Sequence, residues 1–147
     1  MNYGGIEMLV GAKMVLATEL AGDLYFLTDR GLYVGRPYGD CCASCYVQHI
    51  EGTWALAKGA TIASVEGIEL PPVPQEEQND VSDVWGHRIT TDKGVCTIEM
   101  RVDHNGYYGG SLNFDGNQSW PNAVHADCAE HPELGIACGC LKVLDDY

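Results

Sequence analysis

The chain has 147 residues, with 21 Asp and Glu against 8 Lys and Arg, which gives a formal net charge of −13 at neutral pH. Hydrophobic residues make up 46% and charged residues 20%, a composition typical of globular domains and not of disordered chains. A chain of this length buries roughly two-thirds of its unfolded surface, so we expect a single core. The basic residues are scattered and form no stripe that would neutralise phosphates, which disfavours direct DNA or RNA binding.

The sequence shows no segment typical of export or of membrane insertion. Glu7, Lys13 and Glu19 interrupt the apolar N-terminal stretch, which also lacks a basic beginning. The uncharged runs are too short to span a bilayer. The odd count of seven cysteines favours reduced thiols or metal ligation over a disulfide framework. We therefore expect an intracellular protein that contacts no membrane.

The first half of the chain predicts antiparallel strands. Residues 23–28 and 32–35 predict a hairpin closed by a glycine-containing turn, with residues 14–20 pairing beside it. Residues 52–60 predict one short helix, and residues 61–65 a returning strand. The expected fold class is mainly β, a β-rich α+β fold made of an antiparallel sheet of hairpins.

The span 66–83 carries acidic residues, no basic residue, and Pro71, Pro72 and Pro74 in its middle. This composition predicts a long exposed acidic loop. A loop of that length in a compact domain is either functional or loosely ordered, and we favour loose order here.

Residues 94–102 show the strongest strand pattern in the chain. One face carries Cys96, Ile98, Met100 and Val102, and the other carries Thr97, Glu99 and Arg101. Turn sequences separate this segment from residues 85–90 before it and 107–114 after it. We expect three consecutive antiparallel strands.

Residues 115–147 are rich in Gly, Asn, Pro, Cys and His and show little strand or helix pattern. We expect an antiparallel β-rich domain over residues 1–114. Residues 115–147 would form an irregular Cys/His-rich extension packed on it through Trp120 and the cysteines.

Three groups of residues carry a resemblance to a known family. The first group is Asp40-Cys41-Cys42 followed by Tyr46 and by Ile50-Glu51-Gly52. The second is Lys93-Gly-Val-Cys-Thr-Ile98, and the third is Asn105-Gly-Tyr-Tyr108. Because these groups follow one another in this order, residues 12–114, approximately, resemble a family of small domains encoded in tailed-bacteriophage and prophage genomes. That family has no assigned function, so the resemblance implies a phage origin and supplies no catalytic residues. Residues from 115 onward depart from the pattern.

Two cysteine pairs have a spacing that lets two thiolates reach one zinc ion, namely Cys42 with Cys45 and Cys138 with Cys140. Further ligands would be His125, Cys128 and His131. A long stretch of chain separates the two pairs, whereas a specific zinc signature keeps them closer. The alternative is that the cysteines are small buried hydrophobes. We expect no cofactor, with zinc as the alternative.

The sequence favours no enzyme. Cys45 and His49 would share one face of a helix, but no oxyanion hole or orienting group accompanies them. The many carboxylates form close pairs everywhere, so spacing cannot choose a catalytic pair. No phosphate-binding glycine loop is present. Tyr107 and Tyr108 would form a recognition patch or, with more weight, place one ring inside and one outside. Core or sheet-covering positions, rather than a stacking platform, are expected for the tryptophans, Trp54, Trp85 and Trp120.

The acidic excess is the feature that most needs a function, because such a field attracts surfaces evolved to bind nucleic acid. With a phage origin, it favours a non-enzymatic inhibitor of a host defence system, of the anti-CRISPR or anti-defence kind, acting in the cytoplasm of the infected bacterium. Its partner would be a host protein or ribonucleoprotein complex. The expected contact residues are Glu76, Glu77, Asp80, Asp83, Trp120, Glu130 and Glu133.

Two alternatives stay open. The first is an oligomeric sponge for a nucleotide immune signal, in which Arg36, Arg88 or Arg101 would hold phosphates and Tyr107 or Tyr108 would stack on the base. The second is a zinc-stabilised structural or accessory module of the phage.

Overall fold

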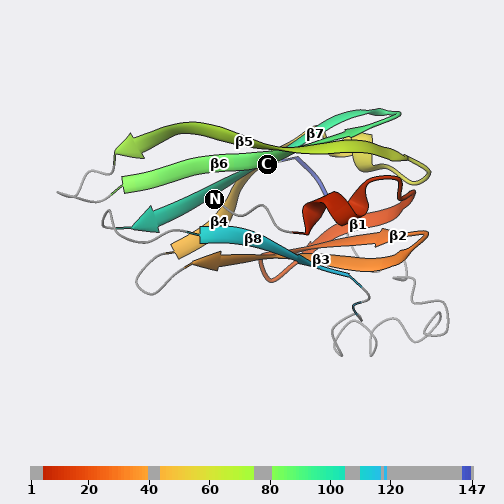
Figure 1. Cartoon of the computed structure of the whole chain (residues 1–147), viewed down its shortest axis with the longest axis horizontal. Helices are drawn as coiled ribbons and strands as arrows, with labels where there is room; N and C mark the ends of the chain where they lie inside the picture. Colours follow the sequence, from red (N-terminus) through yellow and green to blue (C-terminus); the bar gives the residue numbers. More distant parts are fainter. Residues whose placement is uncertain are drawn as a thin grey trace.

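A computed structural model describes residues 5–39, 44–74, 81–104, 110–116, 118 and 144–146. Within these residues the chain forms two four-stranded antiparallel sheets that face each other (Figure 1). The mainly β class expected from the sequence is confirmed. No helix in the described part is long and apolar enough to cross a membrane.

The first sheet has the order β1-β2-β3-β8 and the second the order β4-β7-β6-β5. The strands of the first sheet are β1 (Met14–Leu20), β2 (Asp23–Thr28), β3 (Gly31–Gly39) and β8 (Gly110–Asp115). Those of the second are β4 (Ser44–Glu51), β5 (Ile62–Pro74), β6 (Val81–Thr91) and β7 (Gly94–His104). Two single 3-10 turns are η1 (Ile6–Leu9) and η2 (Thr53–Leu56).

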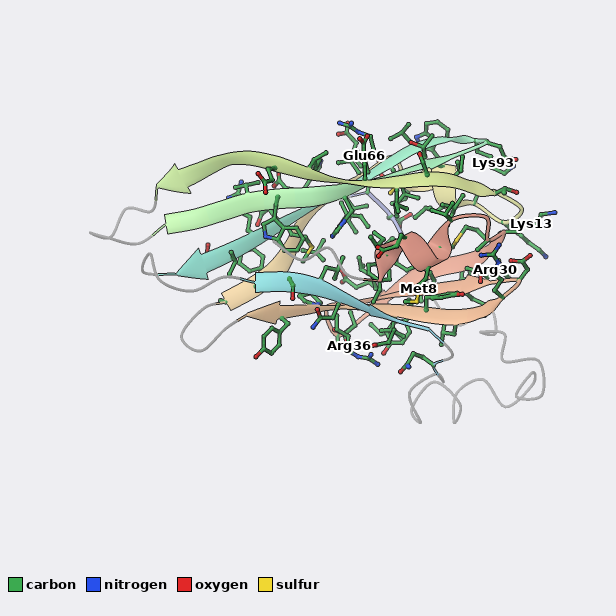
Figure 2. The ribbon with its side chains drawn as sticks, in the orientation of Figure 1. Met8, Lys13, Arg30, Arg36, Glu66 and Lys93 are labelled. Atoms are coloured by element: carbon green, nitrogen blue, oxygen red, sulfur yellow. The ribbon has the colours of Figure 1, made fainter. Side chains whose placement is uncertain are left out.

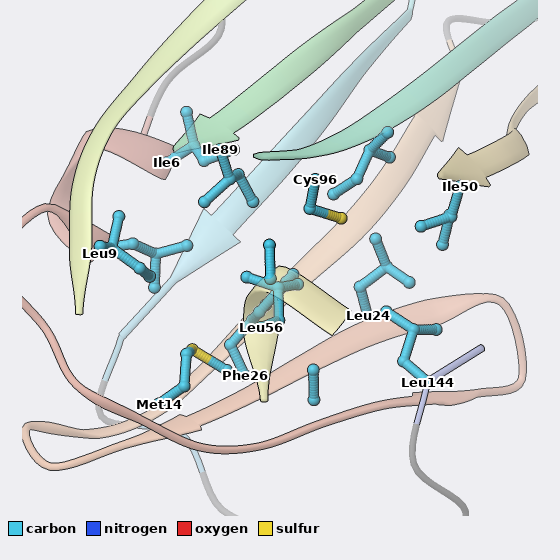
Figure 3. Packing of buried hydrophobic residues seen from close by; sticks show 14 of the residues in the cluster. Ile6, Leu9, Met14, Leu24, Phe26, Ile50, Leu56, Ile89, Cys96 and Leu144 are labelled. Carbon is cyan, nitrogen blue, oxygen red and sulfur yellow. The ribbon is translucent and has the colours of Figure 1, made fainter. Parts of the chain in front are cut away.

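The core lies between the two sheets (Figure 3). From β7 the sequence predicts a buried face of Cys96, Ile98, Met100 and Val102, and all four side chains are fully buried. The first sheet contributes Leu24, Phe26, Leu112 and Phe114 to the same core region. The rings of Phe26 and Phe114 lie 5.6 Å apart between centroids. The buried side chains that alternate along β7 and β8 therefore meet inside a sandwich, while β2 also buries Tyr25 and Leu27 in a second cluster with Leu32 and Val34 of β3.

The two sheets are joined by backbone hydrogen bonds at one end. The amide of Gly11 donates to the carbonyl of Ile62, and the amide of Met14 donates to the carbonyl of Ala60, each at 2.7 Å. Lys13 and Thr61 form an antiparallel bridge between them. The start of β1 thus pairs with the start of β5, and the sandwich closes there as a barrel would.

Residues 144–146, here called the C-terminal strap, lie along the free edge of β1. The amide of Leu144 donates to the carbonyl of Ala17 at 2.8 Å, and the side chain of Leu144 joins the core. The carboxylate of Asp146 accepts hydrogen bonds from the amides of Gly52 and Thr53 and from the Thr53 hydroxyl. The strap therefore ties β1 to the turn η2.

Leu144 tests the contribution of the strap. Replacing Leu144 by Ala should lower the free energy of unfolding by about 2–5 kcal/mol, because it removes a buried side chain from the core. The neighbouring Asp145 is exposed, so Asp145→Ala should stay within about 0.5 kcal/mol of the parent. Urea unfolding measures both. Equal stability of the two variants would show that the strap does not stabilise the fold.

The expected neighbour of β7 on its second side was wrong. We expected residues 107–114 beside residues 94–102, but β7 pairs with β6 and β4, and β8 pairs with β3. The physical reason is that β4 already occupies that edge of β7. The chain therefore crosses to the other sheet, where Leu112 and Phe114 reach the core.

The span 66–83, expected as an acidic loop, is mostly a β-hairpin. Strand β5 continues to Pro74 and β6 begins at Val81, while residues 75–80 lie outside the described residues. Prolines fit here because β5 is the edge strand of its sheet. The pairing with β6 also shifts register between Leu70 and Val73, where Pro71 and Pro72 sit.

The helix expected over residues 52–60 is reduced to the single turn η2. Gly52 and Gly59 both adopt left-handed backbone angles, with φ of 84° and 91°, which a continuous helix cannot contain. The strand expected after it, residues 61–65, is present as the beginning of β5. Most of the extension expected over residues 115–147 lies outside the described residues.

Candidate functional site

An open cleft of about 420 Å³ lies between the β1–β2 turn and the strands β3 and β4. Its lining residues are Glu19, Ala21, Gly22, Asp23, Pro37, Cys45, Tyr46 and Val47. The turn has two residues, Ala21 and Gly22, with φ of 53° and 87°. Left-handed angles at both positions are those of the tight hairpin turn that matches the twist of the strands. The turn is therefore short, and the two acidic lining residues, Glu19 and Asp23, lie just before and just after it in the chain.

The cleft is acidic. Among the described residues, its lining includes the acidic residues Glu19 and Asp23 and no basic residue. Partial burial raises the pKa of Asp23, and the guanidinium of Arg36, 3.8 Å away, works against that rise. Arg36 also lies 3.3 Å from Asp115, so its charge is shared between two carboxylates. The cleft therefore suits a positively charged guest.

Tyr46 and Cys45 form the wall contributed by β4. The Tyr46 hydroxyl donates to Asp103 on β7 at 2.9 Å, and burial together with this carboxylate raises the pKa of Tyr46. The Cys45 thiol donates to the carbonyl of Ser111 on β8, with a sulfur to oxygen distance of 3.6 Å. Burial raises the pKa of Cys45. A raised pKa keeps the thiol protonated, which does not favour a nucleophile.

Cys45 and His49, which the sequence already disfavoured as a catalytic pair, lie on the strand β4 and not on a helix. Four residues of strand span roughly 13 Å. His49 is instead 3.9 Å from Glu51. The thiol and the imidazole therefore do not form a catalytic pair.

The structure describes only part of the expected zinc site. Cys45 is described, whereas Cys42, Cys138 and Cys140 lie outside the described residues. Among the residues that the structure describes, no three His, Cys, Asp or Glu side chains gather closely enough to hold a metal ion. Cys96, the other described cysteine, is fully buried, and burial raises its pKa to about 12. Cys96 is thus a core residue, as the alternative reading of the cysteines expected.

Of the expected partner-binding residues, only Asp83 falls in a described strand, where it pairs with Val102 in the backbone register of β6 and β7. The others lie outside the described residues, namely Glu76, Glu77, Asp80, Trp120, Glu130 and Glu133. Their role stays a prediction.

The arginines of the nucleotide hypothesis are already engaged and lie apart. Arg88 contacts Glu66 at 2.8 Å, and Arg101 lies 3.6 Å from Glu99. Arg36 sits on the other sheet beside Asp23 and Asp115. The expected stacking residues Tyr107 and Tyr108 lie outside the described residues. The structure therefore does not bring these arginines together into one phosphate site.

The tryptophans have opposite environments. Trp85 is 1% exposed and packs edge to face against His87, as expected for a core residue. Trp54 is 62% exposed and its ring lies against Gly94 at the start of β7, so of the two expected environments, core or sheet-covering, it does not have the core one. The turn η2 buries Ala55 and Leu56 in the core and leaves the side chain of Trp54 on its exposed side.

Sequence reasoning did not select Glu19 or Asp23. The available signal was the pair of acids flanking a two-residue turn, but β4 and β3 complete the cleft from segments farther along the chain. Nothing in local spacing shows that these segments meet.

Comparison with known families and proteins gives one match. Residues 7–114 match the family described as "Domain of unknown function (DUF7448)". No curated protein and no solved structure matches the chain significantly. The matched region runs from η1 to β8 and so includes every described strand. The chain belongs to this family of domains of unknown function.

Proposed function

We propose that the protein is a non-enzymatic, phage-encoded inhibitor that binds a protein or ribonucleoprotein of a host defence system in the bacterial cytoplasm. The binding surface is acidic, and the cleft between β1, β3 and β4 receives a basic side chain of the partner. Support for the phage origin comes from the motif resemblance. Support for the mode of binding comes from the distribution of charge.

The observation that carries the proposal is an acidic cleft on a strongly acidic chain. Glu19 and Asp23 line it, none of its described lining residues is basic, and the net charge of the chain is −13. A Lys or Arg side chain entering the cleft would meet both carboxylates, and the Tyr46 ring would line its apolar stem. Such a guest is what nucleic-acid-binding proteins display on their surfaces.

The charges on the two sheets strengthen this reading. Arg36, Arg88 and Arg101 each lie beside a carboxylate, so they add little positive potential to the surface. Long-range attraction toward a basic partner would raise the association rate and weaken as salt screens it, with a Debye length of about 8 Å at physiological ionic strength.

The walls of the cleft are held before binding. The tight turn fixes one rim, and the bonds from Tyr46 to Asp103 and from Cys45 to Ser111 fix the other. A partner side chain would therefore enter a preformed site and pay little ordering entropy there.

Two charge-matched variants test the proposal. The first, Glu19→Gln with Asp23→Asn, neutralises the cleft. The second, Glu51→Gln with Glu66→Gln, removes the same charge from residues outside the cleft lining. The tagged parent protein captures its partner from bacterial lysate, and the purified partner is then used for stopped-flow association at several salt concentrations.

We expect the cleft variant to associate about tenfold more slowly and with a shallower salt dependence, and the matched variant to change much less. Equal slowing in both variants would contradict the role of the cleft and leave only general attraction. Unchanged rates in both would contradict the acidic interface. A third variant neutralises the predicted contact residues Glu76, Glu77, Asp80 and Asp83. Its association rate measures how much that segment contributes to binding.

A further inference from the structure

A second surface lies at the closed end of the sandwich, around the exposed indole of Trp54. Trp54 is 62% exposed, and the nearby Val95 is 41% exposed. The benzenoid end of the indole rests on Gly94, where an added Cβ would lie 2.1 Å from the ring. Only glycine therefore allows the ring to take this place, and most of the ring remains open to solvent.

The turn that carries Trp54 is held from several sides. On one side, Asp146 accepts hydrogen bonds from the amides of Gly52 and Thr53. On the other, the buried Thr91 hydroxyl donates to the carbonyl of Ala55 at 2.7 Å. A tryptophan that only faces solvent does not require its turn to be held by these hydrogen bonds. The bonds do reduce the entropy that the ring would lose on contact with a ligand.

Basic residues that are free of ion pairs gather at the same end. Lys13, Lys58 and Lys93 form no ion pair within the described parts of the chain. Backbone contacts join their segments, since Lys13 bridges Thr61 and the amide of Asp92 donates to the carbonyl of Thr61. Figure 2 shows Lys13, Lys93 and Arg30 at this end, away from Arg36.

The acids of this end are partly used by the fold. The Asp29 carboxylate accepts a hydrogen bond from the amide of Lys13, and the Asp92 carboxylate accepts one from the amide of Thr61. Both hydrogen bonds hold turns in place. On a chain of charge −13, the lysines of the described residues are Lys13, Lys58 and Lys93, and all three belong to the segments that meet at this end.

We propose that Trp54, with Lys93 and Lys58, forms a binding site for a small nucleotide. The indole would stack on the base, and the ammonium groups would contact the phosphates. A short anion is favoured over a nucleic-acid polymer, because a polymer would extend into the negative field of the rest of the molecule. This site is separate from the acidic cleft, so neither proposal depends on the other.

Isothermal titration calorimetry with ATP, GTP, CTP and UTP tests the proposal. Adenosine, tripolyphosphate, a short single-stranded DNA and a Glu-rich peptide are titrated in parallel. The variants are Trp54→Ala and Lys93→Gln, with Arg88→Gln as the control that removes one basic charge elsewhere. Thermal unfolding first verifies that each variant is folded, which we expect because all three side chains are exposed.

We expect at least one nucleotide to bind, about tenfold more weakly in Trp54→Ala, about threefold more weakly in Lys93→Gln and equally in Arg88→Gln. Adenosine and tripolyphosphate should each bind more weakly than ATP if ATP is bound. Absence of binding by all four nucleotides would overturn the proposal, as would binding that survives Trp54→Ala. Tripolyphosphate binding as tightly as the nucleotide would overturn the stacking role. Tighter binding of the DNA or the peptide would replace the small nucleotide by that polymer.

Discussion

Replacing Trp85 by Ala should lower the free energy of unfolding by about 3–5 kcal/mol. Trp85 is 1% exposed and belongs to the core cluster that the two sheets share. Its removal leaves a large cavity between strands whose backbones are fixed by pairing on both sides, because β6 lies between β5 and β7. Chemical unfolding monitored by circular dichroism measures the change.

The matched control is the same substitution at Trp54. Trp54→Ala should change the free energy of unfolding by less than about 1 kcal/mol, because the indole is mostly in solvent. The comparison keeps the chemistry of the substitution constant and varies only the burial. Equal losses in the two variants would contradict the placement of these two residues.

Acidification from pH 7 to pH 4 should remove about 3 kcal/mol of stability through His87 alone. His87 is fully buried on the inner face of β6, and burial lowers its pKa from 6.5 to about 4, against a small opposite effect of Glu7. Between these two values the unfolded chain binds a proton at this residue and the folded chain does not. The stability that depends on neutral His87 is therefore fully present above pH 6.5. It is lost as the pH falls toward 4, and the loss levels off at lower pH.

The variant His87→Gln isolates this contribution. Its unfolding free energy should fall less steeply between pH 6.5 and pH 4 than that of the parent. Other groups change the stability of both proteins in acid. One is Asp146, whose pKa is lowered by its hydrogen bonds to Thr53 and Gly52, so that its protonation also destabilises the fold. Subtracting the two pH curves removes such shared effects. Parallel curves would show that the pKa of His87 does not change on folding.

Local pattern predicted the strands well where one face is buried. The alternation at Cys96, Ile98 and Met100 gave the inner face of β7, and the turn sequence between β2 and β3 gave their hairpin. Both features are set within a few residues of chain. The partner of β8 is not, because which sheet edge is free depends on where β4 has already paired.

Proline and tryptophan show a second limit of local reasoning. Pro71, Pro72 and Pro74 indicate a loop by composition, yet an edge strand with a register shift accommodates them. Trp54 indicates a core residue by type, yet its exposure follows from the position of η2 at an end of the sandwich. In both cases tertiary position decides.

The acidic cleft could not be predicted for the same reason. Its acids come from the β1–β2 hairpin, Pro37 from β3, and Cys45 and Tyr46 from β4. Among many carboxylates, only the folded structure shows which ones share a concave surface. The abundance of acidic residues in the sequence indicated the kind of surface and not its location.

The most direct test of the proposed function is the efficiency of phage plating on bacteria that carry single defence systems, CRISPR systems among them, and express this protein. We expect the parent to raise plating by at least about tenfold on cells carrying the inhibited system, and the variant Glu19→Gln with Asp23→Asn to lose that gain while the charge-matched Glu51→Gln with Glu66→Gln variant retains it. Unchanged plating across the panel with the parent protein, at verified expression, would contradict the proposal that it inhibits host defence.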